Sequence, residues 1–382
     1  MTKFSKVLSL ALVILFGFTA CSKGGGISDS YKDDQFASED LKSTVETIKG
    51  DHYIAVAAPL TGAYRELGKT ILEGAELAVE DFNKTVGDKN KIGILTIDDG
   101  GLVIEGLQRA DIAIAQNVLG VIGHLNSEVS IEASRKYQKA KIPQISPASS
   151  HPKFTERPNF KGYVFRTIGT DRQLGETAAN YVLSNSNLKK VAVLYNDRPY
   201  GVSVAAEFVR NLAKDTSKDL VFYETIPVRT KDHGPTADKI AAKAPDIAFF
   251  VGEYNDAGYL LQELKKRLPN LQFLGAEGIH NPEFIKIAGN SSEGAMVVGM
   301  ETLKGAVSDV YKSRFKKTDS AFVGSSYEAT SILLNAIKAN NFKNTEAIAK
   351  TIAGNGRFDP NGDLIEPNFV LYRIKDSEFL KI

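Results

Sequence analysis

The stretch that decides the fold runs from Gly120 to Ser150 and reads GVIGHLNSEVSIEASRKYQKAKIPQISPASS. Its first four residues form an apolar run with glycines, which is typical of a buried parallel strand. Val129, Ala133 and Tyr137 follow at four-residue spacing and predict one face of a helix. A second short strand is expected to begin at Pro143. The pattern therefore predicts strand, turn, helix, strand and turn, in that order.

Both predicted strands end in turns rich in small polar residues, 124–127 and 147–150. Because neighbouring parallel strands end at the same edge of a sheet, these turns should lie close together, and this edge is where open α/β sheets bind ligands. Helix amino termini there present backbone N–H groups that attract anions such as carboxylates. Serine is also favoured in helix caps and turns, so a purely local role stays open.

The same alternation of strand and helix continues along the chain. Strands alternating with helices imply parallel sheets joined by right-handed crossovers. A single sheet of more than about ten strands would be unusual. We therefore predict an α/β fold with two doubly wound parallel-sheet lobes. Strands are expected at 53–58, 91–97, 120–123, 143–146 and 163–168, then at 191–195, 221–228, 247–251, 273–275 and 295–298, with a mainly helical tail over 307–353 and a last strand at 369–374.

The first 20 residues have the pattern of a signal peptide. Two lysines precede an apolar run over 7–18, and Phe18-Thr19-Ala20-Cys21 follows. This pattern resembles a bacterial lipoprotein signal, in which the cysteine is acylated and becomes the new amino terminus. We predict a signal peptide over 1–20, lipidation at Cys21 and a flexible tether over 21–50, which would anchor the protein on the periplasmic or extracellular face of a cell-envelope membrane. An ordinary secretory signal followed by a stray cysteine is the alternative.

Composition disfavours several classes of function. The chain carries 47 basic and 46 acidic residues, a balance that argues against a nucleic-acid partner. Cys21 is the only cysteine, so no other thiolate is available as a nucleophile. The five histidines show no metal-ligand spacing, and Asp98-Asp99 fits a strand end better than a metal pair. No hydrolase motif is visible, so neither catalysis, a cofactor nor a metal is expected.

A set of short motifs occurs in a fixed order: APLTG at 58–62, GAELA at 74–78, VIGH at 121–124, ISPAS at 145–149, FRT at 165–167, YG at 200–201 and GAEG at 275–278. This ordered set resembles the branched-chain (leucine, isoleucine and valine) amino-acid-binding proteins of bacterial ABC transporters, which have the type I periplasmic binding fold. The resemblance covers about residues 51–375. It implies two lobes joined by three hinge crossings, near Gly169, Met300 and Pro367, with lobe 1 over 51–169 plus 301–366 and lobe 2 over 170–300 plus 367–382.

The resemblance also implies a cleft that holds an amino-acid zwitterion. Ser127 and Ser150, with Ser149 in the same turn, would bind the α-carboxylate through hydroxyl and N–H groups. The Ala148 carbonyl, the Ser150 hydroxyl and the Glu277 carboxylate would bind the α-ammonium. The side-chain pocket and the closing tyrosine would be formed by Leu67, Asn126, Tyr200, Glu253 and Tyr327.

Glu253 bears on specificity. Family members that bind branched-chain residues tend to carry aromatic groups at the positions matching Leu67 and Glu253. If Glu253 points into the cleft, the ligand should be polar or cationic, because a buried carboxylate without a partner is costly. The alternative is that Tyr254 points inward and Glu253 faces solvent.

The prediction is thus an extracytoplasmic solute-binding lipoprotein, acting as a monomer, that captures a branched-chain amino acid or a polar relative and delivers it to an ABC transporter permease. A ligand-sensing receptor of the same fold, and a binder of a small amide or urea-like solute, are alternatives. A lipid-anchored hydrolase is a further alternative, which the missing catalytic motifs disfavour.

Overall fold

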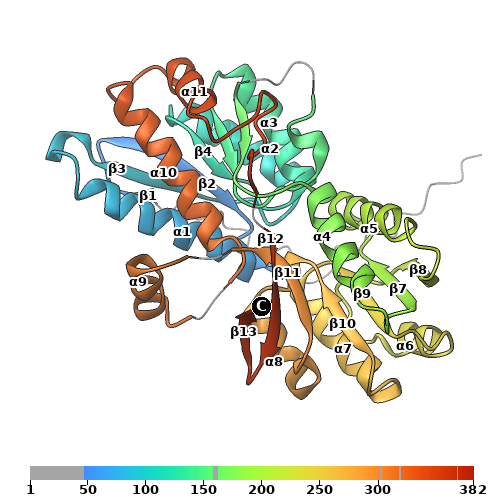
Figure 1. Cartoon of the computed structure of the whole chain (residues 1–382). Helices are drawn as coiled ribbons and strands as arrows, with labels where there is room; N and C mark the ends of the chain where they lie inside the picture. Colours follow the sequence, from blue (N-terminus) through green and yellow to red (C-terminus); the bar gives the residue numbers. More distant parts are fainter. Residues whose placement is uncertain (1–46, 158–161, 302, 318–319, 368) are drawn as a thin grey trace, which may run out of the picture.

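The computed structural model describes residues 47–157, 162–301, 303–317, 320–367 and 369–382. The predicted signal peptide and Cys21 lie outside the described residues. The described strands form two separate sheets, one in each lobe (Figure 1). In the described part of the chain, no helix combines the length and the apolar content needed to span a bilayer.

The first lobe is built on a six-stranded sheet in the order β1-β3-β2-β4-β5-β6. Its strands are parallel except β1, which pairs antiparallel with β3. Strand β1 lies within residues 21–50, which were predicted to be a flexible tether, so the end of that segment belongs to the sheet. Helices α1 and α10 pack together on one face, and α2 and α3 cover the other (Figure 1). The strands are β1 (Thr47–Ile48), β2 (His52–Ala58), β3 (Ile92–Asp98), β4 (Val121–Gly123), β5 (Gln144–Ser146) and β6 (Val164–Arg166). The helices are α1 (Arg65–Asn83), α2 (Val103–Ala115), α3 (Ser127–Lys139), α9 (Ala306–Phe315), α10 (Val323–Ala339) and α11 (Thr345–Ala353).

The second lobe has a seven-stranded sheet in the order β13-β12-β11-β10-β9-β7-β8. Strands β7 to β11 are parallel, and β12 and β13 add an antiparallel edge. Strand β13 was not predicted from the sequence. The strands are β7 (Lys190–Tyr195), β8 (Asp219–Thr225), β9 (Ile247–Val251), β10 (Gln272–Gly275), β11 (Met296–Met300), β12 (Phe369–Lys375) and β13 (Glu378–Lys381). The helices are α4 (Asp171–Leu183), α5 (Pro199–Leu212), α6 (Gly234–Ala241), α7 (Tyr254–Arg267) and α8 (Pro282–Ala288). Short 3-10 helices complete the chain at Gly62–Tyr64, Asp88–Asn90, Pro152–Phe154, Glu277–Ile279 and Gly289–Ser292.

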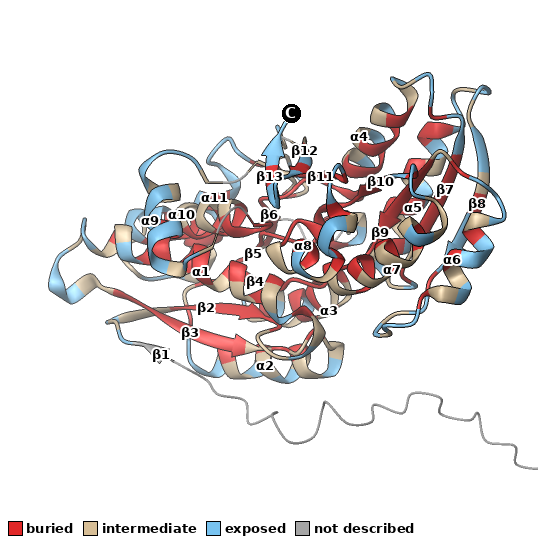
Figure 2. Ribbon diagram, turned by 90° about the horizontal axis from the view of Figure 1, so that it is seen from below, coloured by how far each residue is buried: buried red, intermediate tan, exposed pale blue. Residues whose placement is uncertain are grey.

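Strand β9 shows why its sequence is apolar throughout. Ile247, Phe249 and Val251 pack in the cluster formed with α4 and α5, whereas Ala248 and Phe250 pack in the cluster formed with α6, α7 and α8. Successive side chains of a strand point to opposite faces, so helices on both faces require an unbroken apolar run. Figure 2 shows the same pattern, with buried strands between helices whose outer faces are exposed.

The chain passes between the lobes three times, after β6, after β11 and before β12 (Figure 1). The first crossing and the start of β12 are in contact: a Cβ at Gly169 would lie 2.2 Å from the Phe369 ring, so the backbone of Gly169 packs closely against that ring. These crossings confirm the predicted fold class of two doubly wound lobes.

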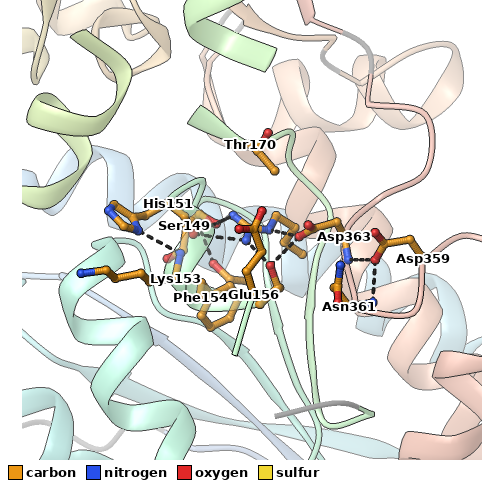
Figure 3. Close-up of polar contacts among 12 residues, drawn as sticks. Ser149, His151, Lys153, Phe154, Glu156, Thr170, Asp359, Asn361 and Asp363 are labelled. Carbon is orange, nitrogen blue, oxygen red and sulfur yellow. Dashed lines mark hydrogen bonds and ion pairs between the residues drawn. The ribbon is translucent and has the colours of Figure 1, made fainter. Parts of the chain in front are cut away.

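Arg166, at the end of β6, ties the segment before the third crossing to the turn after β5. Its side chain is fully buried, and it donates to Asp363 Oδ1 at 2.6 Å and to the Ser149 carbonyl at 2.8 Å. Asp363 is held in turn by Asp359, whose Oδ1 accepts from the Asp363 N–H at 2.9 Å (Figure 3). This cluster fixes the backbone of the turn that contains Ala148 and Ser150.

Replacing Arg166 by Met should destabilise the protein by about 3–5 kcal/mol, because it leaves the largely buried Asp363 carboxylate without its cationic partner and the Ser149 carbonyl without its side-chain donor. Arg172→Met is the matched control, since Arg172 pairs with Glu156 at the surface, where an ion pair contributes about 0–1 kcal/mol. Urea denaturation would measure both changes. Equal losses for the two variants would contradict the anchoring role of Arg166.

Candidate ligand-binding site

The two lobes present equivalent edges to each other. In each sheet, the strand order reverses at one place, between β2 and β4 in the first lobe and between β7 and β9 in the second. Open α/β sheets bind ligands outside the carboxyl ends of the strands at this reversal. Loops from both edges line one cavity, the concave kind of site in which small molecules bind. The lining residues are Leu67, Leu125, Asn126, Ser127, Glu128, Ala148, Arg198, Tyr200, Glu253, Glu277, Gly278 and Phe322.

The first-lobe wall depends on a tightly packed turn between β4 and α3. Gly123 has φ +132°, and a Cβ there would lie 2.0 Å from the Ala57 carbonyl oxygen, so only glycine fits. His124 is fully buried, and its Nδ1 lies 2.6 Å from Asp99 Oδ2. Asp99 therefore has a structural role, and the described residues contain no cluster of His, Cys, Asp and Glu that could hold a metal.

Helix α3 begins at the cavity. Ser127 is its first residue, and Asn126 at the N-cap position forms no capping hydrogen bond through its side chain. The first turn of a helix leaves backbone N–H groups without intrahelical partners. This end of the cavity is therefore suited to an anionic group.

The second-lobe wall carries two buried acidic groups, Glu253 and Glu277. Glu277 follows β10, and Glu253 follows β9. The two loops touch, since a Cβ at Gly278 would lie 2.3 Å from the Gly252 carbonyl oxygen. Asn196, after β7, donates from Nδ2 to Glu253 Oε2 at 2.9 Å and so joins the loops on either side of the strand-order reversal.

Burial sets the electrostatics of this wall. It raises the pKa of Glu277 to about 8, that of Glu253 to about 7 and that of nearby Asp171 to about 6. Glu277 Oε2, the Tyr200 hydroxyl and Ser150 Oγ have no partner in good hydrogen-bonding geometry among the described residues, although Tyr200 and Glu277 are close enough to influence each other's pKa. The wall is thus acidic and desolvated, an arrangement that a bound cation would relieve.

The lobes touch across the mouth of the cavity. Arg198 of the second lobe donates to Glu128 Oε1 of α3 at 2.6 Å, and its guanidinium lies 4.8 Å from the centre of the Tyr64 ring. The Tyr254 hydroxyl donates to the Ala63 carbonyl at 3.2 Å. These contacts describe a closed arrangement of the two lobes.

Most of the predicted site residues meet at this cavity, namely Leu67, Asn126, Ser127, Ala148, Tyr200, Glu253 and Glu277. Ser149 and Ser150 are fully buried but do not line it. The Ser149 hydroxyl lies 2.5 Å from that of Ser130 and holds the turn together. Ser150 adjoins Asp171. The Ser150 hydroxyl lowers the pKa of Asp171, but burial has the larger effect and raises it.

Tyr327 does not reach the cavity. It lies in α10, where its hydroxyl donates to Asp81 Oδ2 at 3.1 Å, and Phe322 just before that helix occupies the cavity wall instead. The structure also decides between Glu253 and Tyr254: Glu253 lines the cavity, whereas the Tyr254 hydroxyl contacts the first lobe outside it.

Several lining residues were not predicted. Leu125, Glu128 and Gly278 directly neighbour predicted residues in sequence, and Arg198 lies two positions before Tyr200, so their proximity was the available signal. Phe322 carries no such signal, because its place depends on a left-handed backbone conformation with φ 68° before α10.

Residues 52–371 match the family model described as Periplasmic binding protein. The chain belongs to the periplasmic binding protein family. This membership confirms the resemblance seen in the sequence, and it confirms that this periplasmic binding protein is a binding module and not an enzyme.

Relatives cover nearly the whole chain. The Leu/Ile/Val-binding protein homolog 1 of Brucella suis is 29% identical over 337 residues, which are 85% of this chain and 90% of that protein. The leucine-, isoleucine-, valine-, threonine-, and alanine-binding protein of Pseudomonas aeruginosa is 27% identical, over 88% of this chain and 92% of its own. A branched-chain amino acid transporter substrate binding protein of Streptococcus pneumoniae, solved with isoleucine, has the same fold with a TM-score of 0.80, at 21% identity over 87% of this chain and 99% of its own.

The raised pKa of Glu277 predicts how stability depends on pH without ligand. The folded state keeps the Glu277 proton up to about pH 8, whereas the unfolded state releases it near its ordinary pKa of 4.5, so stability should fall as pH rises between these values. Glu277→Gln should remove this loss, which is at most about 1.4 kcal/mol per pH unit.

The difference between wild type and Glu277→Gln isolates Glu277, because the other titrating groups are common to both proteins. Thermal unfolding of wild type, Glu277→Gln and the exposed control Glu224→Gln would be followed from pH 6.5 to 8. A constant difference between wild type and Glu277→Gln across this range would contradict the assignment.

Proposed function

We propose that this periplasmic binding protein captures an amino acid as a zwitterion between its lobes and delivers it to the permease of an ABC transporter. The observation that carries the proposal is the charge layout of the cavity. An acidic wall containing Glu277 lies on the second lobe, and the amino terminus of α3 lies on the first.

The carboxylate end of the ligand would lie at the start of α3. Ser127 lines the cavity at the first position of that helix, where hydroxyl and backbone N–H donors can bind an anion. Ser150, two positions after the lining residue Ala148, would add a second hydroxyl, because its buried Oγ has no partner in good hydrogen-bonding geometry among the described residues. Neutral donors of this kind bind a carboxylate without burying an additional cation.

The ammonium end would lie against Glu277, with the Ala148 carbonyl as a further acceptor. A charge-assisted hydrogen bond is roughly twice as strong as a neutral one. Ligand binding would also stabilise the ionised form of Glu277, whose pKa burial raises to about 8. Tyr200 would contact the ligand from the second lobe.

The names of the relatives support an amino acid as the ligand, since those of Brucella suis and Pseudomonas aeruginosa are named for binding leucine, isoleucine and valine. The sequence supports an extracytoplasmic location, with Cys21 lipidated and the tether linking the lobes to a membrane. The permease would then recognise the closed lobes at that surface.

Glu277→Gln should weaken amino-acid binding by about 2–5 kcal/mol, which is a loss of roughly 30-fold or more in affinity, because the ligand ammonium loses its buried charge partner. Ser150→Ala should cost about 1.5–3 kcal/mol, the contribution of one hydrogen bond to a charged group.

A thermal-shift screen of amino acids identifies the ligand, since about 100 times the Kd adds about 2.7 kcal/mol of stability. Calorimetry then compares wild type with both variants, and Glu224→Gln serves as the exposed-carboxylate control. Equal affinity in wild type and Glu277→Gln would reject the proposed ammonium site.

Cys21→Ser should release the protein from the membrane fraction, because the acyl chains carried by Cys21 would provide the anchor. Cell fractionation with immunoblotting measures the distribution, and Ser22→Ala controls for changes near the cleavage site. An unchanged membrane fraction for Cys21→Ser would contradict lipid anchoring.

A further inference from the structure

We infer that the side-chain part of the cavity selects an amino acid whose side chain ends in N–H donors. A cationic side chain is preferred over a neutral amide, and an aliphatic side chain is disfavoured. The inference rests on the proposed function and adds the class of side chain. It depends on where Glu253 lies and on which charges are already paired.

Glu253 is a buried carboxylate on the cavity wall. Its exposed fraction is 6%, and it stands at the N-cap position of α7 without capping that helix through its side chain. Among the described residues, Asn196 is the one hydrogen-bond donor to this carboxylate, at 2.9 Å from Oε2. Within the described residues, no Lys, Arg or His nitrogen lies within 4.0 Å of this carboxylate. A buried acidic group without a cation therefore faces the ligand.

Arg198 does not fill that role. It is the one basic residue among those that line the cavity in the described chain, and its guanidinium pairs with Glu128 and lies over the Tyr64 ring. The lining acids are Glu128, Glu253 and Glu277. Once Arg198 pairs with Glu128 and the ligand ammonium pairs with Glu277, Glu253 is the lining acid that has no cationic partner.

The pKa of Glu253 is consistent with this account. Burial is the main cause that raises it to about 7, and the charge of Arg198 opposes the rise. The group therefore resists ionisation in the ligand-free site, and a cation bound beside it would favour the ionised form.

The rest of the pocket suits a side chain with an apolar stem. Leu67, Leu125 and Phe322 line the cavity and are nearly fully buried. Methylene groups of a long basic or amide side chain can pack on such a surface while the polar end reaches an acceptor. A purely aliphatic side chain would bury Glu253 further and give it no donor, which is unfavourable.

Calorimetry of arginine, lysine, glutamine and leucine binding to the wild-type protein tests the inference. At least one of the donor-bearing amino acids should bind tenfold or more tightly than leucine. Glu253→Leu should reduce that preference at least tenfold, and leucine binding should be unchanged or tighter. Glu253→Gln keeps the shape and can still accept from Asn196, so it tests the charge without a change in packing.

Two controls separate this inference from the proposed function. Glu277→Gln should weaken every amino acid alike, because it acts on the shared ammonium, and Glu224→Gln should change nothing. Leucine binding as tightly as the donor-bearing amino acids, with no response to either Glu253 substitution, would overturn the inference and leave the proposed function standing. If none of the twenty amino acids bound, the proposed function would fall, and this inference with it.

Discussion

Burial of carboxyl groups between the two lobes is the constraint on which the site depends. Glu277 and Glu253 line the cavity, Asp171 lies nearby, and burial raises the pKa of all three. A protein that only needed stability would replace such groups by apolar ones, because an unpaired buried charge is costly. Their presence at the cavity is explained when a ligand supplies the missing positive charge.

The fold brings these groups together by using the same arrangement twice. Each lobe places its strand-order reversal at the cavity, so loops after β4 and β5 face loops after β7, β9 and β10. Neither lobe alone holds both the α3 amino terminus and the acidic wall. Arg166 links the turn after β5 to Asp363, in the segment that precedes the third crossing, and so fixes the backbone near Ala148. Contacts such as Arg198–Glu128 then hold the lobes closed.

The periodic parts of the molecule could be predicted from sequence because burial on both faces leaves an unbroken apolar run, as in β9, and a helix face leaves four-residue spacing, as in α3. Strands β1 and β13 were missed, since a two-residue strand and a polar edge strand carry little pattern. The ammonium-side residue Glu277 could be placed on the wall from its motif alone. Glu253 and Tyr254 could not be separated, because a one-residue shift in a loop decides which side chain faces the cavity. The Arg198–Glu128 pair joins residues far apart in sequence, and no local pattern marks it.

The most direct test of the account is whether both charged ends of an amino acid are required for binding. Calorimetry would compare the preferred amino acid with its decarboxylated amine and with its deaminated acid, on the same wild-type protein. The account predicts that each analogue binds at least a hundredfold more weakly than the amino acid, because each leaves one end of the cavity unmatched. An analogue that bound as tightly as the intact amino acid would contradict the two-ended site.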